Sequence, residues 1–289
     1  MDINTQFNFA NFVSNNISDK SKNVSEINSD ASIFSEKSDN NTRIIAHRGD
    51  SDDAPENTLE AYKTAVENGY KIAECDIRWT SDGEAVLLHD KSINRTARKG
   101  NGCFLIFPKL CKNMSLEELN QYDFSYKYPE YINKSKITTL EDLLKFSKEN
   151  NLDLYIDLKE KAGFDDEKAK KITETVKNLG MEENVTWIST NCDYLKSVQK
   201  NLPKARLGYL YRKKISDKTI EELDSLNNGK GEVFLDIKNT KVTQKGVDKL
   251  HNAGYDFEVW TVNNKKEAEK LIKMGCKGIT TDKLDKNDI

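Results

Sequence analysis

Short apolar runs alternate with amphipathic segments along most of this 289-residue chain. The alternation begins at about Arg43, and it is typical of βα units and a parallel sheet. The candidate strands are residues 43–47, 71–78, 153–158, 185–190, 205–211, 232–236, 256–261 and 278–281. Eight βα units predict a closed TIM-type (β/α)8 barrel, an α/β fold whose functional site lies at the carboxyl ends of the strands.

The segments between these strands have the apolar spacing of helices. They are residues 58–68, 140–150, 165–179, 193–201, 217–226, 243–253 and 264–274. At the start of the first segment, Asn57 and Glu60 have the spacing of a capping box, and Gly69 is a typical C-terminal stop. A further apolar run, residues 85–89, is expected to form the return arm of a β-hairpin that lies outside the eight barrel strands.

Two carboxylates and a histidine are brought together by this predicted hairpin. Glu74 and Asp76 are two residues apart in a strand, so their side chains point to the same face. Asp82 and Gly83 lie between two apolar runs, which is a strong signal for a tight turn. If they are the two loop residues, His89 lies directly opposite Asp76. Two acids and an imidazole at a strand tip predict a site for a hard metal ion beside a proton carrier.

The positions of the histidines favour a site over the simpler alternative, a strand with a solvated polar face. The chain has only three histidines. Two of them, His47 and His89, end short apolar runs and are followed by charged or glycine-containing loops. Sites on parallel sheets and barrels lie at such strand ends. His251 lies in a predicted helix, and we interpret it as an ordinary helix-face residue.

A set of short motifs follows a fixed order along the chain. The motifs are His47-Arg48-Gly49, Pro55-Glu56-Asn57-Thr58, Glu74-x-Asp76, His89-Asp90, Asp157-Leu158-Lys159, Trp260-Thr261-Val262-Asn263 and Gly278-Ile279-Thr280-Thr281-Asp282. In order and spacing, this set resembles the glycerophosphodiester phosphodiesterase family, from about Arg43 to about Leu284. The resemblance implies a metal-dependent enzyme on a TIM-type barrel that cleaves glycerophosphodiesters to glycerol 3-phosphate and an alcohol.

The resemblance implies that His47 and His89 are the acid–base pair. Glu74, Asp76 and Asp157 offer three carboxylates on two strands, and such ligands suit Ca²⁺ or Mg²⁺ rather than zinc. One departure concerns Asp157, because the family usually has Glu at this position. Aspartate is one methylene shorter, so the metal would lie nearer that strand or be bridged to it by water.

Three further residues are implied as substrate contacts. Arg48 and Lys159 would hold phosphoryl oxygens, Arg48 through a bidentate contact. Trp260 would contact the glycerol at the barrel mouth. For two other motif residues a supporting role is expected: Glu56 holds its loop or pairs with a basic residue, and Asp282 forms structural hydrogen bonds.

Two other functions remain open. A related barrel phospholipase, of the lysophospholipase D-like or cyclising type, would share the histidines and the metal, but it should carry an apolar rim. Residues 104–107 are the candidate for that rim. The second alternative is a catalytically idle barrel that acts as a binding module. Loss of a motif histidine or acid would support it, and the sequence retains them all.

The charge distribution excludes several kinds of partner. The formal net charge is −3 at pH 7, and acidic and basic residues are interspersed. The sequence therefore lacks a basic stripe for nucleic acid and a polybasic patch for a membrane surface. No apolar run approaches the length of a membrane span. The expected partner is the small-molecule glycerophosphodiester that the resemblance implies.

The five cysteines include no CxxC pair, so a thiolate metal site is not expected. One disulfide is conceivable, between Cys103 and Cys111, which flank an apolar loop segment. We favour five free thiols in a reducing compartment, which points to the cytoplasm. The start of the sequence lacks the basic segment and apolar core of a signal peptide. Secretion would require a signal that had already been removed.

The chain divides into two parts by composition. Residues 1–42 are rich in Asn, Ser, Asp and Lys and cannot bury enough apolar surface to order themselves, so they predict a disordered tail. Residues 43–289 form the predicted barrel domain. Within it, residues 91–136 are an insertion that contains Tyr122, Phe124, Tyr126, Tyr128 and Tyr131. We expect two roles for this insertion with equal weight. It acts as a lid or specificity loop, or its aromatic residues simply pack it onto the barrel.

Overall fold

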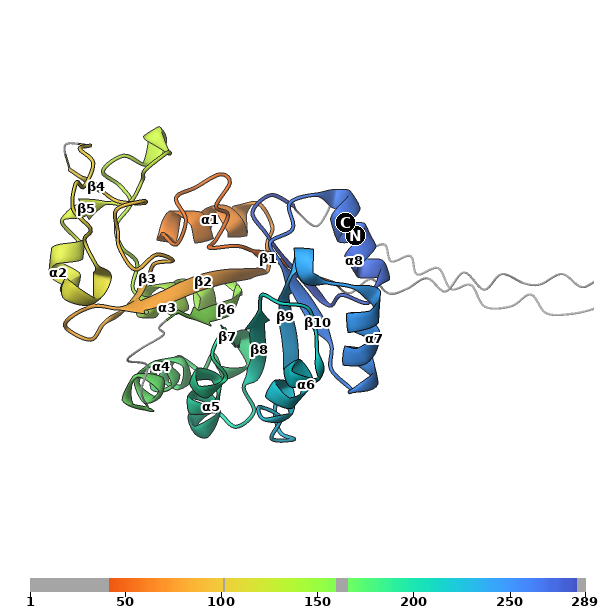
Figure 1. Ribbon diagram of the computed structural model, residues 1–289. Helices are drawn as coiled ribbons and strands as arrows, with labels where there is room; N and C mark the ends of the chain where they lie inside the picture. Colours follow the sequence, from red (N-terminus) through yellow and green to blue (C-terminus); the bar gives the residue numbers. More distant parts are fainter. Residues whose placement is uncertain (1–41, 101, 160–165, 285–289) are drawn as a thin grey trace, which may run out of the picture. The chain divides into compact units, whose positions relative to one another are not determined.

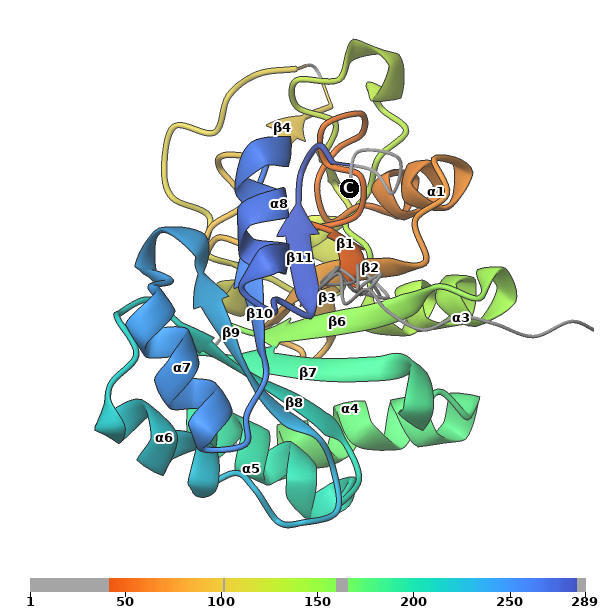
Figure 2. The same ribbon diagram turned by 90° about the vertical axis from the view of Figure 1, so that its right-hand side faces the viewer.

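Eight parallel strands close into a barrel within the residues that the computed structural model describes, which are 42–100, 102–159 and 166–284 (Figures 1 and 2). The barrel strands are β1 (Arg43–Ala46), β2 (Ile72–Trp79), β6 (Asp153–Leu158), β7 (Val185–Ser189), β8 (Arg206–Tyr211), β9 (Val233–Lys238), β10 (Phe257–Trp260) and β11 (Gly278–Thr281). They pair in that order, and β11 and β2 both pair with β1 and so close the ring. The TIM-type barrel and its eight predicted strands are confirmed.

The helices lie outside the ring of strands (Figure 2). They are α1 (Leu59–Glu67), α2 (Leu116–Leu119), α3 (Leu140–Asn150), α4 (Asp166–Leu179), α5 (Cys192–Asn201), α6 (Asp217–Asp224), α7 (Gln244–Asn252) and α8 (Lys265–Lys273). Every predicted helix is present, with ends that differ from the prediction by two residues at most. The predicted disordered tail lies outside the described residues except for Thr42, whose hydroxyl group donates to the Cys276 carbonyl.

The predicted hairpin is present, but the predicted register differs from the observed one by one residue and is therefore wrong. Strand β3 (Ala85–Leu87) pairs antiparallel with β2, with Ile77 opposite Leu87. The Leu88 N–H donates to the Asp76 carbonyl at 2.9 Å, so the residue opposite Asp76 is Leu88 and not His89.

The turn explains the shift in register. The Thr80 N–H donates to the Glu84 carbonyl at 3.0 Å, so the loop has three residues rather than two. Its last residue, Gly83, has φ of 80°, the left-handed conformation that such a three-residue loop requires. Because β3 ends at Leu87, strand alternation does not fix the direction of His89, which reaches the barrel mouth from the following loop.

The start of α1 also differs from the prediction. Thr58 is the N-cap residue, and it makes no side-chain capping hydrogen bond. Asn57 has φ of 57°, and its side chain binds Asp76 instead of the helix. The predicted capping box is therefore wrong. Gly69, with φ of 87°, follows the helix end as predicted.

The barrel interior combines apolar and charged layers. Ile45, Tyr155, Ile188, Leu210 and Phe234 form an apolar cluster inside the ring, while a larger core fills the space between strands and helices. A polar network lies toward the amino ends of the strands. At its centre is Glu258, whose Oε1 atom lies 2.6 Å from the Arg43 guanidinium group and 2.8 Å from that of Arg206. Arg206 also donates to the Tyr155 hydroxyl group.

The insertion has an apolar core of its own. Residues such as Ile93, Leu119 and Phe124 pack there with Val86 and Leu88 of the hairpin. Two short strands, β4 (Arg98–Lys99) and β5 (Tyr122–Asp123), form a separate small sheet. The five cysteines are thiols, so the conceivable Cys103–Cys111 disulfide is not formed. Among the described helices, none has the length and apolar character that crossing a membrane requires.

Candidate active site

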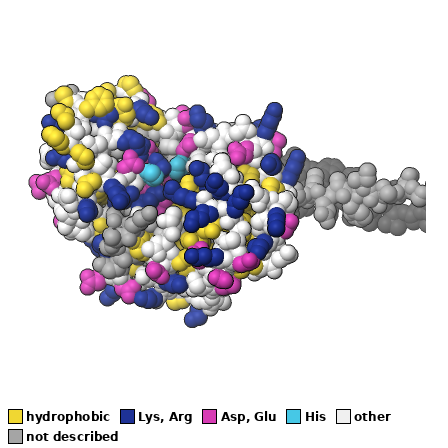
Figure 3. Space-filling view, viewed as in Figure 1, with side chains coloured by type: hydrophobic (Ala, Val, Ile, Leu, Met, Phe, Trp, Pro, Cys, Tyr) yellow, Lys and Arg dark blue, Asp and Glu magenta, His cyan; other side chains and the backbone are white. Residues whose placement is uncertain are grey.

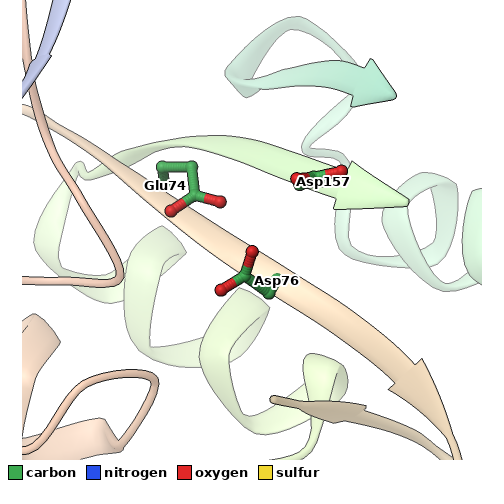
Figure 4. A group of neighbouring side chains, drawn as sticks. All are labelled: Glu74, Asp76 and Asp157. Atoms are coloured by element: carbon green, nitrogen blue, oxygen red, sulfur yellow. The ribbon is translucent and has the colours of Figure 1, made fainter. Parts of the chain in front are cut away.

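Three buried carboxylates lie close together on two neighbouring strands (Figure 4). Glu74 and Asp76 belong to β2 and Asp157 to β6, and Asp76 is paired with Asp157 in the register of the two strands. Each side chain offers an oxygen within 4.8 Å of the others. All three residues are at most 4 % exposed. The structure thus brings together the three residues predicted as metal ligands.

Two cations lie against this cluster. Lys159 Nζ is 2.8 Å from Asp76 Oδ1 and also contacts Asp157. The side-chain Nε atom of Arg48 is 3.2 Å from Asp76 Oδ2, and the backbone N–H of Arg48 donates to Glu74 Oε2. Burial would raise the pKa of Asp76, but the charges of Lys159 and Arg48 lower it well below its usual range. Burial, assisted by the charge of Asp76, raises the pKa of Glu74.

The loop that carries Arg48 is held in an unusual backbone conformation. Arg48 has φ of 61° and Gly49 has φ of 76°. A Cβ atom on Gly49 would lie 2.7 Å from Ala61, so only glycine fits there. Asn57, in the second loop motif, donates to Asp76 Oδ2 at 2.8 Å and accepts from the Asp76 N–H at 3.1 Å. The two motifs therefore position Arg48 and Asp76 against each other.

His47 follows β1 and is oriented by Asp282. Its Nδ1 lies 2.6 Å from Asp282 Oδ1. Asn263 donates to the other carboxylate oxygen of Asp282 at 2.7 Å. Burial would raise the pKa of Asp282, but the hydrogen bond from His47 lowers it to about 2. With Nδ1 engaged, Nε2 of His47 is the atom left for proton transfer.

His89 has a corresponding carboxylate partner. Its Nδ1 lies 2.7 Å from Asp90 Oδ1, and Arg95 Nε lies 2.6 Å from Asp90 Oδ2. Arg95 also pairs with Glu56, which in turn accepts from Arg48 at 2.9 Å. Burial lowers the pKa of His89 despite the opposing effect of the Asp76 charge. A continuous chain of ion pairs thus connects His89 to Arg48, and Glu56 pairs with basic residues as predicted.

These groups surround an open cavity of about 100 Å³ at the barrel mouth. The predicted site residues that line it are His47, Arg48, Glu74, His89, Asp157, Lys159 and Trp260, and Asp76 lies buried behind them. The Trp260 indole donates to the Asp236 carbonyl at 3.1 Å, and the Arg212 guanidinium lies 5.0 Å from the Trp260 ring centre. On the face of the molecule that Figure 3 shows, histidine side chains lie beside Lys and Arg side chains.

Sequence reasoning assigned no site role to Asp90, Arg95 or Arg212 and gave Asp282 only a structural one. Asp90 lies next to His89 in its motif, and Asp282 ends the last motif. Their places in these motifs could have indicated that they form hydrogen bonds with the histidines. Arg95 and Arg212 belong to no motif. They reach the site because the fold places the loops after β3 and β8 there.

A second groove, of about 310 Å³, adjoins the cavity. His47 and Arg48 line both spaces, and the insertion contributes Tyr126 and Tyr128 to the groove. The Tyr128 hydroxyl group donates to the Ser51 carbonyl at 2.5 Å. Phe124 thus packs in the core of the insertion, while Tyr126 and Tyr128 border the groove. The role of the insertion as a lid or specificity loop stays a prediction.

Comparisons with known proteins agree with this geometry. Residues 47–286 match the model of the glycerophosphoryl diester phosphodiesterase family. A glycerophosphodiester phosphodiesterase of Caldanaerobacter subterraneus subsp. tengcongensis is 30 % identical over 241 residues, which cover 83 % of this chain and 94 % of that protein. The enzyme of the same name from Bacillus altitudinis is 29 % identical over 252 residues, which cover 85 % of this chain and 96 % of that protein.

A solved structure is similar as well. An Oleispira antarctica phosphodiesterase, in complex with the product sn-glycerol-3-phosphate, has a TM-score of 0.74 and 26 % sequence identity, with 83 % of this chain and 92 % of that chain covered. The match of the family model extends over nearly the whole described barrel. The chain therefore belongs to the glycerophosphoryl diester phosphodiesterase family and is a phosphoric diester hydrolase.

Proposed function

We propose that this protein hydrolyses glycerophosphodiesters to glycerol 3-phosphate and an alcohol, with a divalent metal ion and a pair of histidines. The observation that carries the proposal is the meeting of three carboxylates at the barrel mouth, in a cavity that two oriented histidines also line. The Oleispira antarctica relative, whose product is sn-glycerol-3-phosphate, supports the identity of the product.

The residues present fit a Ca²⁺ or Mg²⁺ ion. Glu74, Asp76 and Asp157 form an all-oxygen donor set of the kind that hard cations prefer. A cation bound among these three carboxylates would stabilise their ionised forms. When bound, the ion supplies Lewis-acid stabilisation of the charge on the phosphoryl oxygens.

The protein's own groups perform the remaining steps. Arg48 and Lys159 hold the phosphate oxygens by charge-assisted hydrogen bonds. One of His47 and His89 accepts a proton from the attacking hydroxyl group, and the other protonates the leaving alkoxide. Attack by water gives glycerol 3-phosphate directly. Attack by a glycerol hydroxyl group gives a cyclic phosphate, which water then opens to glycerol 3-phosphate with the two histidine roles reversed. Asp282 and Asp90 fix the ring orientation of each histidine through Nδ1. Trp260 forms one wall of the cavity that receives the glycerol.

Product analysis tests this function. The full-length protein is incubated with glycerophosphocholine, glycerophosphoethanolamine and glycerophosphoglycerol, with added Ca²⁺ or Mg²⁺. We expect release of glycerol 3-phosphate from at least one of them. The catalytically idle barrel predicts no turnover of any substrate, and release of free phosphate without glycerol 3-phosphate would contradict the proposed reaction.

An exposed apolar loop favours the lysophospholipase as a second candidate. Phe104, Ile106 and Phe107 are 67 %, 87 % and 78 % exposed. The loop backbone is nevertheless held in place, because the Asn94 side-chain amide donates to the carbonyls of Leu105 and Phe107 at 3.0 Å and 2.9 Å. Fixed, exposed apolar side chains of this kind suit contact with a lipid surface.

The loop is connected to the site groove. The Phe104 ring packs edge-on against Tyr126 with 6.0 Å between ring centres, and Tyr126 lines the groove beside His47. Replacing Phe104, Ile106 and Phe107 with Ser should reduce turnover of lysophosphatidylcholine vesicles while preserving turnover of soluble glycerophosphocholine. Equal effects on both substrates, or no turnover of the lysolipid by the wild-type protein, would rule out this candidate.

A further inference from the structure

Asp236 is a buried carboxyl group of the cavity to which the proposed chemistry assigns no task. It is 2 % exposed, and it lines the same cavity as His47, Lys159 and Trp260. In the part of the chain that the structure describes, its Oδ1 atom has no hydrogen-bond partner. Native proteins rarely leave a buried polar atom unpaired unless it serves a function such as ligand binding.

The inward direction of Asp236 follows from strand alternation in β9. Phe234 belongs to the apolar cluster inside the barrel, whereas Leu235 and Ile237 pack in the core between strands and helices. Asp236 therefore shares the inward face with Phe234, one step nearer the carboxyl end of the strand. Barrel sites form at that end.

The cavity has two chemically different walls. Arg48 and Lys159 lie on the wall that would bind phosphate. The wall next to Asp236 includes apolar side chains, because Leu210 is its register neighbour in β8 and Ile188 and Trp260 also line the cavity. Its register neighbour in β10 is Glu258. A ligand that fits both walls carries an anion at one end and a short carbon skeleton at the other. A hydroxyl group on that skeleton would satisfy the unpaired oxygen.

Trp260 is held beside Asp236 by a hydrogen bond. Its indole N–H donates to the Asp236 carbonyl, so the ring and the Asp236 side chain belong to one rigid unit at the adjoining ends of β9 and β10. A small hydroxylated skeleton that packs on the indole would then have its hydroxyl groups near the carboxyl group.

We propose that Asp236 is a specificity-determining residue that forms a hydrogen bond with a hydroxyl group of the glycerol moiety. The proposal rests on the proposed function and names the group that selects glycerol. A carboxylate would accept from the hydroxyl group, and a protonated carboxyl group would donate to it, so either form provides the contact. A site built for a hydroxyl group discriminates strongly against an analogue that lacks it, because the buried polar atom then stays unpaired.

Binding measurements test the proposal independently of turnover. Calorimetric titration compares glycerol 3-phosphate with propyl phosphate, which lacks both hydroxyl groups, on the full-length protein with Mg²⁺ or Ca²⁺. The wild-type protein should bind glycerol 3-phosphate about 10-fold or more tightly than propyl phosphate, the scale of one buried hydrogen bond. Asp236→Leu should bring this ratio close to one by weakening glycerol 3-phosphate alone. Asp236→Asn, which can still pair with a hydroxyl group, should keep most of the preference.

Two controls make the result decisive. Asp256→Asn removes the same charge at an exposed position outside the cavity and should leave the affinity ratio unchanged. If Asp236→Leu does not fold, Asp236→Ala is measured in its place. A wild-type ratio that persists in the folded Leu or Ala variant overturns the proposal. Turnover of the three glycerophosphodiesters is measured separately, and its absence with all three would overturn the proposed function while the affinity ratio still decides the role of Asp236.

Discussion

The Nδ1 atom of His47 lies 2.6 Å from Oδ1 of Asp282, although the two residues are 235 positions apart in the chain. The barrel register produces this contact. Ala46 of β1 is paired with Thr281 of β11, so the residues that follow these strand ends meet at the mouth. The contact orients a histidine of the proposed acid–base pair, and the closure of the barrel thereby completes the site.

Replacing Asp282 with Asn should lower kcat about 10-fold or more, a smaller loss than that of a general acid or base itself, because the amide can impose the wrong tautomer on His47. KM should change little, since Asp282 is proposed to act through His47 and not on the substrate. Steady-state kinetics with glycerophosphocholine measure both constants. Asp256→Asn is the matched control and should behave like the wild-type protein. A change confined to KM would contradict the orienting role.

Asp282 should also make stability depend on pH. Its pKa is about 2 in the folded protein, below the unfolded value of about 3.9. Folding therefore gains stability from this carboxylate above about pH 4, and the gain is lost as the pH falls toward 2. Partial solvent screening reduces the gain to about 1 kcal/mol. Urea denaturation should show a larger difference between wild type and Asp282→Asn at about pH 7 than at about pH 3, and an equal difference would contradict this account.

Substitution of His47 or His89 by Ala should each reduce turnover by roughly 100-fold or more, the usual scale for a general acid or base. Both side chains lie at the barrel mouth outside the apolar clusters, so the melting temperature should change little. His251→Ala provides the matched control, because His251 is an exposed residue of α7. Similar kinetics for all three variants would show that the two histidines have no catalytic part.

The hairpin turn offers a test of backbone conformation. Gly83→Ala should destabilise the protein by about 1–2 kcal/mol, because φ is 80° and an L-residue is strained there. The added Cβ would meet no atom within 4 Å, so the cost is conformational and not steric. Gly100→Ala, also without a close contact and without positive φ, should change stability little. Urea denaturation measures both, and equal effects would be inconsistent with the left-handed turn.

The strands and the acidic cluster could be predicted because their signals are local. Alternating apolar runs define the strands, and the same alternation places Glu74 and Asp76 on one face of β2. The proximity of Asp157 also follows from the sequence once the parallel order of βα units is accepted. The three carboxylates were therefore predicted together, and the structure brings them within 4.8 Å.

The remaining details depend on alternatives that the sequence leaves close in energy. An Asp-Gly turn can form a two-residue or a three-residue loop, and the difference changes which residue faces Asp76. Asn57 could cap α1 or bind Asp76, and the buried carboxylate is the partner that it has in the structure. The Asp282 contact and the unpaired Asp236 oxygen depend on the register of strands far apart in the sequence.

Metal removal tests the central claim most directly. The protein is treated with a chelator, dialysed, and assayed for release of glycerol 3-phosphate before and after addition of Ca²⁺ or Mg²⁺. Because the three buried carboxylates are proposed to hold the ion that stabilises charge on the phosphoryl oxygens, turnover should fall by about 100-fold or more and return with one of the two metals. Undiminished turnover by the metal-free protein would contradict the account.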